Sequence, residues 1–444
     1  MKISVIGCGY LGAVHAVCMA RLGHEVVAID IDEDRIAQLA AGEPPFHEPG
    51  FPELLREAHK TGRITFTTDF SQAASSRVHF LCVGTPQLAD GYAADVSQVD
   101  GATASLIPHL APNPDGPTIV VGKSTVPVGT AQRLQEWLDA EAAPEARATL
   151  VWNPEFLREG FGVEDTLSPD RIVYGFNEGA NSEAAVAALD EVYAEALSRD
   201  IPRLLTDFAT SELVKVAANS FLATKISFIN AMAELCDAAG ADVTKLAEAI
   251  GLDERIGPKF LRAGLGFGGG CLPKDIRAFM ARAGELGADQ ALTFLREVDA
   301  INSRRRDSVV QILAQRFDGQ LSGRRIAILG AAFKPGTDDV RDSPALDVAT
   351  RLAGQGARVV VTDPIASDNA SIVHPELTVK EDFNEALQGA EAVALLTEWP
   401  EYKELDPFQV AELVDVPYIF DGRNVLNPQR WRDAGWTFRG FGRP

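Results

Sequence analysis

The first thirty residues constrain the fold more than any other stretch of the chain. An apolar run from Lys2 to Ile6 leads directly into Gly-Cys-Gly-Tyr-Leu-Gly at positions 7–12. An apolar helix is expected from Val14 to Leu22, and a second strand from Glu25 to Ile29 ends at Asp30. A strand, a glycine turn, a helix and a second strand form the βαβ unit that opens a Rossmann fold. The three glycines, Gly7, Gly9 and Gly12, permit a tight turn, the approach of a pyrophosphate and close packing of helix on strand, so the unit predicts a dinucleotide site.

Two charged residues indicate which dinucleotide this site prefers. Asp30 lies 18 positions after Gly12, where a carboxylate accepts hydrogen bonds from both ribose hydroxyls and repels a 2′-phosphate. NAD is therefore favoured over NADP. Arg35 either reaches the adenosine side of the cofactor or is a solvated arginine on a helix face, and the sequence leaves both interpretations open.

Three further strands are expected, each followed by a polar loop. They lie at Val78–Val83, Thr118–Val121 and Thr149–Trp152. Ligands of open parallel sheets bind beyond the carboxyl ends of the strands, so these loops are candidates to line a cleft for cofactor and substrate. Serine and threonine in such loops also form ordinary turns and caps.

The pattern changes near residue 206. Asp207 is a suitable N-cap, and neither proline nor glycine occurs from Phe208 to Ala239, which predicts one long helix. A helix of this length commonly joins domains or carries an oligomer interface. Lys215 and Asn219 are four residues apart and share one helix face. Taken alone, a lysine there is more simply a solvated side chain than a site residue.

The stretch Gly-Phe-Gly-Gly-Gly-Cys-Leu-Pro-Lys-Asp at positions 266–275 combines glycines with a cysteine. Glycines let a backbone approach another group closely. Cys271 stands where a helix is expected to begin, and a helix N-terminus favours the thiolate. Asp275 lies four positions further along. The stretch is either a nucleophile presented beside a ligand or a tight turn with a buried thiol, and the residues alone favour neither.

A second Rossmann-like unit is expected from Gly323 onward. Its glycine pattern is degenerate, because Gly330 stands alone before a long loop, so this half is expected to bind a different nucleotide or part of the substrate. The expected elements are a strand at 326–329, a helix from Pro344, a strand at 358–362 ending in Asp363, and strands at 392–396 and 418–420 that close the sheet.

The predicted fold class is therefore α/β. An N-terminal Rossmann NAD-binding domain at 1–205 and a C-terminal Rossmann-like domain at 317–444 are joined by a central long-helix domain at 206–316. The central domain contains the cysteine loop, and its long helix is expected to carry an oligomer interface.

Composition excludes several classes of partner and site. The net charge of −22 makes nucleic acid and anionic membrane poor partners. Cys8, Cys18, Cys82, Cys236 and Cys271 are unclustered, so neither a disulfide framework nor a metal site is expected. No apolar run reaches the ~20 residues that a membrane span requires, and no signal peptide is visible. We expect a cytoplasmic protein without a membrane or nucleic-acid partner.

With these pieces in order, the chain resembles the UDP-glucose/GDP-mannose dehydrogenase family over essentially its whole length. The motifs that carry the resemblance are GCGYLG, VGTP, KSTVPVGT, NPEFLREG, ELVKVAANSF, RIGPKFLRAGLGFGGGCLPKD, AFKPGTDDVRDSP and DGRN, in the order of the family. The resemblance implies a four-electron, NAD-dependent oxidation of the C6 hydroxyl of UDP-glucose to a carboxylate. It also implies a UDP-sugar site in the C-terminal domain and at least a homodimer.

By this resemblance Cys271 forms a thiohemiacetal and then a thioester, which water hydrolyses. Lys215, assisted by Asn219, stabilises the oxyanion. Asp275 handles the hydrolytic water, helped by Thr125 and Glu155 through another water, and Glu159 lies near the nicotinamide and the substrate.

The resemblance also implies the binding residues. For NAD they are Gly7, Gly9, Tyr10, Leu11, Gly12, Asp30, Arg35, Val83, Gly84, Thr85, Pro86, Ser124, Thr125, Glu159, Lys274 and Arg341. For UDP-glucose they are Glu155, Phe156, Leu157, Arg158, Glu159, Lys215, Asn219, Arg255, Phe260, Leu261, Gly264, Phe267, Gly268, Lys334 and Arg423, with Arg255 reaching the sugar of a neighbouring subunit.

The chain departs from the family pattern at Gly270, where serine is common, and at Leu272, where phenylalanine is common. Neither change removes a group that the mechanism needs. The alternatives are a sister enzyme acting on GDP-mannose or a UDP-N-acetylhexosamine, a two-electron β-hydroxyacid dehydrogenase, and a sugar-nucleotide sensor without catalysis.

Overall fold

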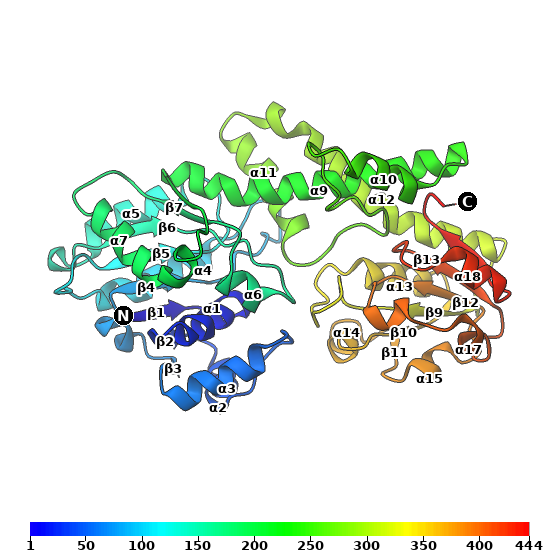
Figure 1. The fold of residues 1–444 in the computed structure, drawn as a ribbon, viewed down its shortest axis with the longest axis horizontal. Helices are drawn as coiled ribbons and strands as arrows, with labels where there is room; N and C mark the ends of the chain where they lie inside the picture. The colour runs from blue at the N-terminus through cyan, green and yellow to red at the C-terminus, as the bar shows by residue number, and fades with distance from the viewer. Residues whose placement is uncertain (444) are drawn as a thin grey trace. The chain divides into compact units, whose positions relative to one another are not determined.

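The structure, a computed structural model, describes residues 1–443 and contains two compact units (Figure 1). One unit comprises Met1–Ala218 together with Arg277–Gly287. The other comprises Asn219–Ile276 together with the chain from Ala288 onward. The domain boundaries predicted after residues 205 and 316 stay predictions. The two units are defined by contacts within the structure, and each combines separate stretches of the sequence.

The N-terminal unit is built on an eight-stranded sheet within the described residues, in the order β3-β2-β1-β4-β5-β6-β7-β8. Neighbouring strands are parallel except β6 and β7, which pair antiparallel at Trp152 and Gly175. The order β3-β2-β1-β4-β5-β6 is that of a Rossmann fold and confirms the prediction. The strands are β1 (Lys2–Ile6), β2 (Glu25–Ile29), β3 (Ile64–Thr67), β4 (Val78–Leu81), β5 (Ile119–Gly122), β6 (Thr149–Trp152), β7 (Ile172–Gly175) and β8 (Arg203–Thr206).

Both faces of this sheet are buried under helices. Successive side chains of a strand point to opposite faces, so one strand can contribute to two hydrophobic clusters. In β1, Ile3 and Val5 belong to one hydrophobic cluster and Ile6 to the other. The first cluster includes residues of α1, α3 and α7, and the second includes residues of α4 and α5. The helices of this unit are α1 (Tyr10–Arg21), α2 (Glu33–Ala41), α3 (Phe51–Thr61), α4 (Ser97–Leu106), α5 (Thr130–Glu141), α6 (Gly162–Leu167), α7 (Ser182–Val192) and α8 (Ala194–Leu197).

The C-terminal unit contains an all-parallel sheet in the order β11-β10-β9-β12-β13-β14. This is a second doubly wound sheet, as predicted. Its strands are β9 (Arg325–Leu329), β10 (Arg358–Thr362), β11 (Thr378–Val379), β12 (Ala392–Leu395), β13 (Tyr418–Asp421) and β14 (Thr437–Gly440). Its helices are α10 (Val243–Gly251), α12 (Thr293–Arg316), α13 (Pro344–Gly354), α14 (Ser367–Val373), α15 (Phe383–Leu387), α16 (Pro400–Lys403), α17 (Pro407–Ala411) and α18 (Pro428–Asp433).

Helix α9 (Phe208–Ala239) is the predicted long helix, with the predicted bounds. Asp207 caps it, because its carboxylate accepts from the backbone N–H of Thr210 at 2.8 Å, and Gly240 follows its last residue with φ +70°. Helix α9 starts in the N-terminal unit and continues in the C-terminal one. Helix α11 (Leu272–Glu285) starts in the C-terminal unit and continues in the N-terminal one. In the chain up to residue 443, none of the helices is long and apolar enough to cross a membrane.

One expectation about the sheets is wrong, and two further strands were missed. The C-terminal sheet does not close at residues 418–420, because β14 pairs with β13 beyond them. Strands β7 and β8 extend the N-terminal sheet past β6, and neither was expected. Strands β7, β8 and β14 are each only four residues long. Most of β8 is also exposed, so it does not show the pattern of a buried strand.

The carboxyl end of the C-terminal sheet is filled by its own side chains. The buried carboxylate of Asp363 accepts from the backbone N–H groups of Ala331 and Ala332 at 2.7 and 3.0 Å. It also accepts from the indole N–H of Trp399 at 2.9 Å. A Cβ built on Gly330 would lie 2.3 Å from Cβ of Thr397. This turn therefore leaves no room for a pyrophosphate, which explains the degenerate glycine pattern.

Candidate functional site

The glycine turn at residues 7–12 has the geometry that a dinucleotide requires. Gly7 adopts φ +90°, a conformation that favours glycine. A Cβ built on Gly12 would lie 1.7 Å from the carbonyl oxygen of Gly7, so α1 approaches β1 closely only because residue 12 has no side chain. Among the described residues, nothing other than Gly9 itself and its two chain neighbours lies within 4 Å of a Cβ built on Gly9. The turn is thus open at the position where the pyrophosphate approaches, and these residues fit NAD.

The start of α1 and the end of β2 supply the polar groups of this site. Helix α1 begins at Tyr10, and its N-cap, Gly9, has no side chain to occupy the first backbone N–H groups, so these can bind phosphate. The carboxylate of Asp30 is buried and accepts from the N–H of Cys8 at 2.6 Å. Nη1 of Arg35 lies 3.2 Å from Asp30. Arg35 thus lies beside the predicted ribose-binding carboxylate, and its contact with the adenosine side of the cofactor stays a prediction.

The two loops after β4 and β5 lie against each other. The hydroxyl of Ser124 donates to the carbonyl of Val83 at 2.7 Å. The hydroxyl of Thr85 donates to the carbonyl of Thr125, also at 2.7 Å. Predicted cofactor residues 83–86 and 124–125 therefore form one continuous rim beyond the carboxyl edge of the sheet.

Lys215 is a buried lysine and not a solvated one. Its side chain is 7% exposed, and Nζ lies 2.8 Å from Oε1 of Glu155. The other oxygen of Glu155 accepts from the N–H of Leu157 at 2.6 Å. The ring of Phe156 lies beside this pair, 5.9 Å from Nζ of Lys215. The loop after β6 thus brings a buried cation and a carboxylate into direct contact.

The remaining residues of this loop have more peripheral surroundings. Arg158 is exposed and its guanidinium pairs with Asp165 at 2.6 Å, so its substrate role stays a prediction. Glu159 is half-buried in the same loop.

In the C-terminal unit, Cys271 lies directly before the first residue of α11 and is exposed. Its carbonyl accepts from the N–H of Asp275 at 2.9 Å, which closes the first turn of the helix. The carboxylate of Asp275 is buried between two donors, Nδ2 of Asn219 at 2.7 Å and Nζ of Lys274 at 2.8 Å. Lys274 and Asp275 thus lie within one helical turn of an exposed thiol, and Asn219 of α9 is hydrogen-bonded to Asp275.

The glycines before Cys271 make room for the protein itself. A Cβ on Gly268 would lie 2.2 Å from the carbonyl oxygen of Asp342. A Cβ on Gly269 would meet the ring of Phe333 at 2.8 Å, and one on Gly270 would meet the guanidinium of Arg341 at 2.7 Å. The positions that the sequence assigned to ligand approach are therefore packed against the segment 333–344 of the same unit.

A pocket of about 600 Å³ lies next to this run. Four predicted substrate residues line it: Phe260, Leu261, Gly264 and Arg423. Its other lining residues include two cations that the sequence analysis missed, Lys259 and Arg262, as well as Glu398 and Asn424. The two cations flank Phe260 and Leu261 in the run Lys-Phe-Leu-Arg, a pattern that could have indicated them. A pocket with cations in an acidic chain suits a phosphate-bearing ligand.

Arg423 has a second task besides lining the pocket. Its Nε donates to the carbonyl of Leu396 at 2.6 Å and its Nη1 to the carbonyl of Gly266 at 2.8 Å. Burial lowers the pKa of this guanidinium, and Glu398 at 3.3 Å partly offsets the effect. Arg423 therefore fixes the start of the glycine run.

Three other predicted residues lie away from this pocket lining. Arg255 is 88% exposed and pairs with Asp253. Arg341 pairs with Asp339 at 2.6 Å, and Nζ of Lys334 lies 5.6 Å from the ring centre of Phe333. Their binding roles stay predictions.

Two buried groups that organise the N-terminal site were missed. The carboxylate of Glu48 accepts from the N–H groups of Gly160 and Val163 at 2.8 and 3.1 Å and from the hydroxyl of Tyr10. It thereby ties the dinucleotide turn to the loop after β6. Nζ of Lys123 donates to Asn153 at 3.0 Å, so the first residues of two neighbouring loops are joined. A charged residue directly after an apolar strand was the available indication for Lys123.

Comparisons with known proteins agree with this arrangement. Three family models match: the NAD binding domain of the UDP-glucose/GDP-mannose dehydrogenase family at residues 1–197, its central domain at 209–304 and its UDP binding domain at 327–428. The chain is 41% identical to a UDP-glucose 6-dehydrogenase of Rhizobium meliloti, over 100% of both chains.

Solved structures are similar as well. A UDP-glucose dehydrogenase from Pyrobaculum islandicum superposes with a TM-score of 0.89 at 39% identity, covering 100% of this chain and 98% of the other. A UDP-D-ManNAc dehydrogenase from Pyrococcus horikoshii gives 0.85 at 26% identity, covering 100% and 99%. The glycine turn that fits NAD, the second sheet with its adjoining pocket and the full-length matches lead to one conclusion: the chain belongs to the UDP-glucose/GDP-mannose dehydrogenase family of NAD-dependent oxidoreductases.

Proposed function

We propose that this enzyme oxidises UDP-glucose at C6 to UDP-glucuronate, with reduction of two NAD. The observation that carries the proposal is the full-length identity of about 40% to UDP-glucose dehydrogenases, against 26% to the UDP-D-ManNAc enzyme. The pocket with its cations supports a nucleoside diphosphate as the ligand.

In the proposed mechanism, NAD when bound would supply the hydride acceptor for two oxidation steps at C6, the first of which also releases the hydroxyl proton. The thiolate of Cys271 then adds to the aldehyde, a new C–S bond forms, and the oxygen takes up a proton to give a thiohemiacetal. Loss of its hydroxyl proton and of the second hydride gives a thioester. Water then adds, the C–S bond breaks, and the carboxylate leaves with the thiolate regenerated.

The surroundings of the charged side chains support the roles proposed for them. Lys215 is buried, so its ammonium acts on a developing oxyanion without much screening by water. Asp275 is held by Asn219 and Lys274, which keeps a carboxylate in place to orient a water near Cys271. Thr125 and Glu155 assist through another water.

The experiment is the ratio of NADH formed to UDP-glucose consumed, in wild type and Cys271→Ser. We expect a ratio of two for the wild type and a stalled second oxidation in the variant. A ratio of one with a fully active variant would identify a two-electron dehydrogenase instead. Parallel assays with GDP-mannose and UDP-N-acetylhexosamines test the substrate, and faster turnover of one of these would overturn the assignment to UDP-glucose.

We further propose that the enzyme is a homodimer formed through α9. Phe221, Phe228 and Leu235 are 67%, 49% and 60% exposed, and their spacing of seven places them on one helix face. A second copy of the same helix offers the matching apolar stripe, and the resemblance assigns Arg255 to a neighbouring subunit. Light scattering should give twice the monomer mass of 47.6 kDa; a monomer at working concentrations would contradict the proposal.

A cytoplasmic location completes the proposal. All five cysteines lie in the described part of the chain and are free, which suits a reducing compartment. Recovery of the activity from an extracytoplasmic fraction would contradict it.

A further inference from the structure

The proposed nucleophile follows a segment that is flexible by composition. Gly266, Gly268, Gly269 and Gly270 precede Cys271, and glycine loses more conformational freedom on folding than any other residue. A nucleophile must nevertheless stay within a fraction of an ångström of its productive position. Something outside the run therefore has to fix its backbone.

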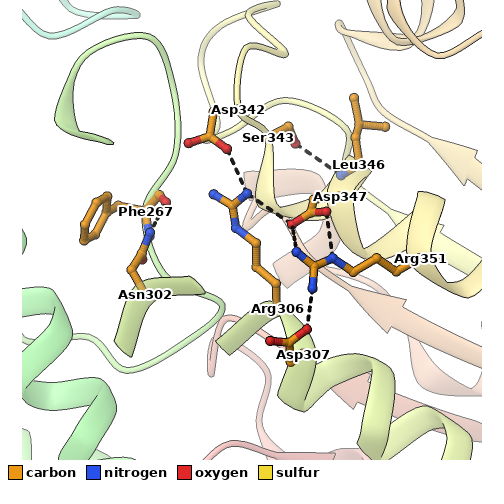
Figure 2. Close-up of polar contacts among 9 residues, drawn as sticks. All are labelled: Phe267, Asn302, Arg306, Asp307, Asp342, Ser343, Leu346, Asp347 and Arg351. Atoms are coloured by element: carbon orange, nitrogen blue, oxygen red, sulfur yellow. Dashed lines mark hydrogen bonds and ion pairs between the residues drawn. The ribbon is translucent and has the colours of Figure 1, made fainter. Parts of the chain in front are cut away.

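Asn302 on α12 forms hydrogen bonds with the backbone of Phe267, in the middle of the glycine run. Its Oδ1 accepts from the backbone N–H of Phe267 at 2.8 Å, and its Nδ2 donates to the carbonyl of the same residue at 2.9 Å. The side chain is buried, and a Cβ on Gly266 would lie only 2.3 Å from its Oδ1. One amide thus satisfies both backbone groups of Phe267 (Figure 2). It also packs on the glycine before it.

Arg306, one turn further along α12, fixes the segment on which the run packs. Its Nη1 donates to Oδ1 of Asp342 at 2.8 Å and to Oδ2 of Asp347 at 3.1 Å, as Figure 2 shows. Asp342 adopts φ +44°, which is unfavourable for a residue with a side chain. The carbonyl of the preceding residue, Arg341, accepts from the N–H of Gly269 at 3.1 Å.

We propose that Asn302 and Arg306 are positioning residues that hold the glycine run, and with it the thiol of Cys271, in the geometry needed for covalent catalysis. Asn302 acts on the run directly and Arg306 acts through the segment 341–343. The two side chains lie on one face of one helix, so α12 sets the distance between both supports. This inference rests on the proposed role of Cys271 as the nucleophile.

Two variants of each residue test the proposal. Asn302→Ala removes both hydrogen bonds, and Asn302→Asp keeps the shape and the acceptor but loses the donor. Arg306→Leu removes both ion pairs, and Arg306→Lys keeps the charge but not the geometry. If a truncated variant does not fold, its conservative partner carries the test. Arg304→Leu is the matched control, because Arg304 lies on the same helix and its ion pair, to Glu234 at 3.5 Å, shares no partner with Asn302 or Arg306.

The first readout needs no turnover. Alkylation of each cysteine by iodoacetamide is followed by mass spectrometry, and hydrogen exchange reports the amides of Phe267 and Gly269. In the residues described by the structure, Cys271 is exposed and the other four cysteines are buried. We expect faster exchange of both amides, and alkylation of Cys271 at neutral pH slowed about threefold or more, because a loosened thiol loses the thiolate-favouring helix N-terminus. The buried cysteines should stay unreactive.

The second readout is kinetic. We expect kcat to fall roughly 10- to 100-fold in Asn302→Ala, less in Asn302→Asp, with KM for NAD nearly unchanged. Arg304→Leu should resemble the wild type in every readout except melting temperature. Unchanged exchange and alkylation in a folded Asn302→Ala variant, or equal effects of Arg304→Leu, would overturn the inference. A fully active Cys271→Ser would overturn the proposed function instead, whatever the exchange data show.

Discussion

A missing side chain serves opposite purposes at Gly9 and Gly12. At Gly12 the absent Cβ is what allows α1 to approach Gly7, whereas at Gly9 the space is open toward the predicted cofactor. Substitutions at the two positions should therefore fail in different ways.

We expect Gly12→Ala to lower the free energy of unfolding by about 1–3 kcal/mol, because the added methyl group overpacks the turn. Gly9→Val should leave stability within about 0.5 kcal/mol, since Gly9 has the ordinary φ of −64°. It should raise the Kd for NAD about tenfold or more by blocking the pyrophosphate. Urea unfolding and calorimetric NAD titration separate the two effects; an unchanged Kd in Gly9→Val would contradict the proposed cofactor position.

Glu212 gives the N-terminal unit a pH dependence. Its two carboxylate oxygens accept from the N–H groups of Gly129 and Ala131 at 2.8 and 2.7 Å. Burial nevertheless raises the pKa of Glu212 from 4.5 to about 7. The folded protein therefore binds a proton that the unfolded chain has already lost between these pH values.

Because of Glu212, we expect the free energy of unfolding to fall as the pH rises from about 4.5 to 7, by about 3 kcal/mol at most. Its contribution is complete below pH 4.5 and lost above pH 7. Glu212→Gln does not titrate, so the difference in free energy of unfolding between variant and wild type should shift in favour of the variant as pH rises. Urea unfolding at pH 5, 6 and 7 measures it, and a constant difference across this range would contradict the prediction.

At the scale of elements, the two doubly wound sheets each have an aspartate at the same position, but the two aspartates have different partners. Asp30 follows β2 and Asp363 follows β10, each at the end of the second strand of its unit. Asp363 accepts from the backbone N–H groups of Ala331 and Ala332 and from the indole N–H of Trp399. It therefore stabilises the fold, whereas Asp30 is predicted to bind the cofactor.

Asp363→Asn should therefore act on stability and not on NAD. The asparagine side chain has one acceptor oxygen, whereas the carboxylate has two. Its NH₂ group would face buried N–H donors, with which it cannot form hydrogen bonds. We expect a loss of roughly 3 kcal/mol in the free energy of unfolding, with the Kd for NAD unchanged. Thermal melting and NAD titration of the same sample test this. A matched Asp30→Asn variant should show the reverse pattern.

The elements also show what could be read from sequence and what could not. Helix α9 was predicted with its observed ends, because Asp207 and Gly240 mark them and no helix breaker lies between. Strand β8 was not predicted, because its residues are largely exposed. The glycines at 266–270 were recognised as a close approach, but their partners were not. Asn302 and Asp342 lie tens of residues away in sequence, and only the fold brings them to Phe267 and Gly268.

At the scale of the whole molecule, the proposed dimer makes a prediction about one apolar stripe. Phe228→Asp places a charge in the middle of the exposed face of α9, so it should shift the assembly toward monomers. Phe408→Asp is the control, because Phe408 is also exposed, 63%, but lies on α17. Light scattering over a concentration series measures the mass. A dimer of unchanged strength in Phe228→Asp would show that this stripe is not the interface.

The division of the chain has a consequence for any attempt to cut it. The two compact units are not consecutive in sequence, because Arg277–Gly287 returns to the N-terminal unit. In that returning segment Arg282 donates to the carbonyl of Val128 at 2.9 Å and contributes to the electrostatic surroundings of Glu212. A fragment that stops at Ala218 would lack this cover, and one that starts at Asn219 would begin in the middle of α9. We therefore expect neither fragment to fold on its own, because each would lack part of the unit that it comes from.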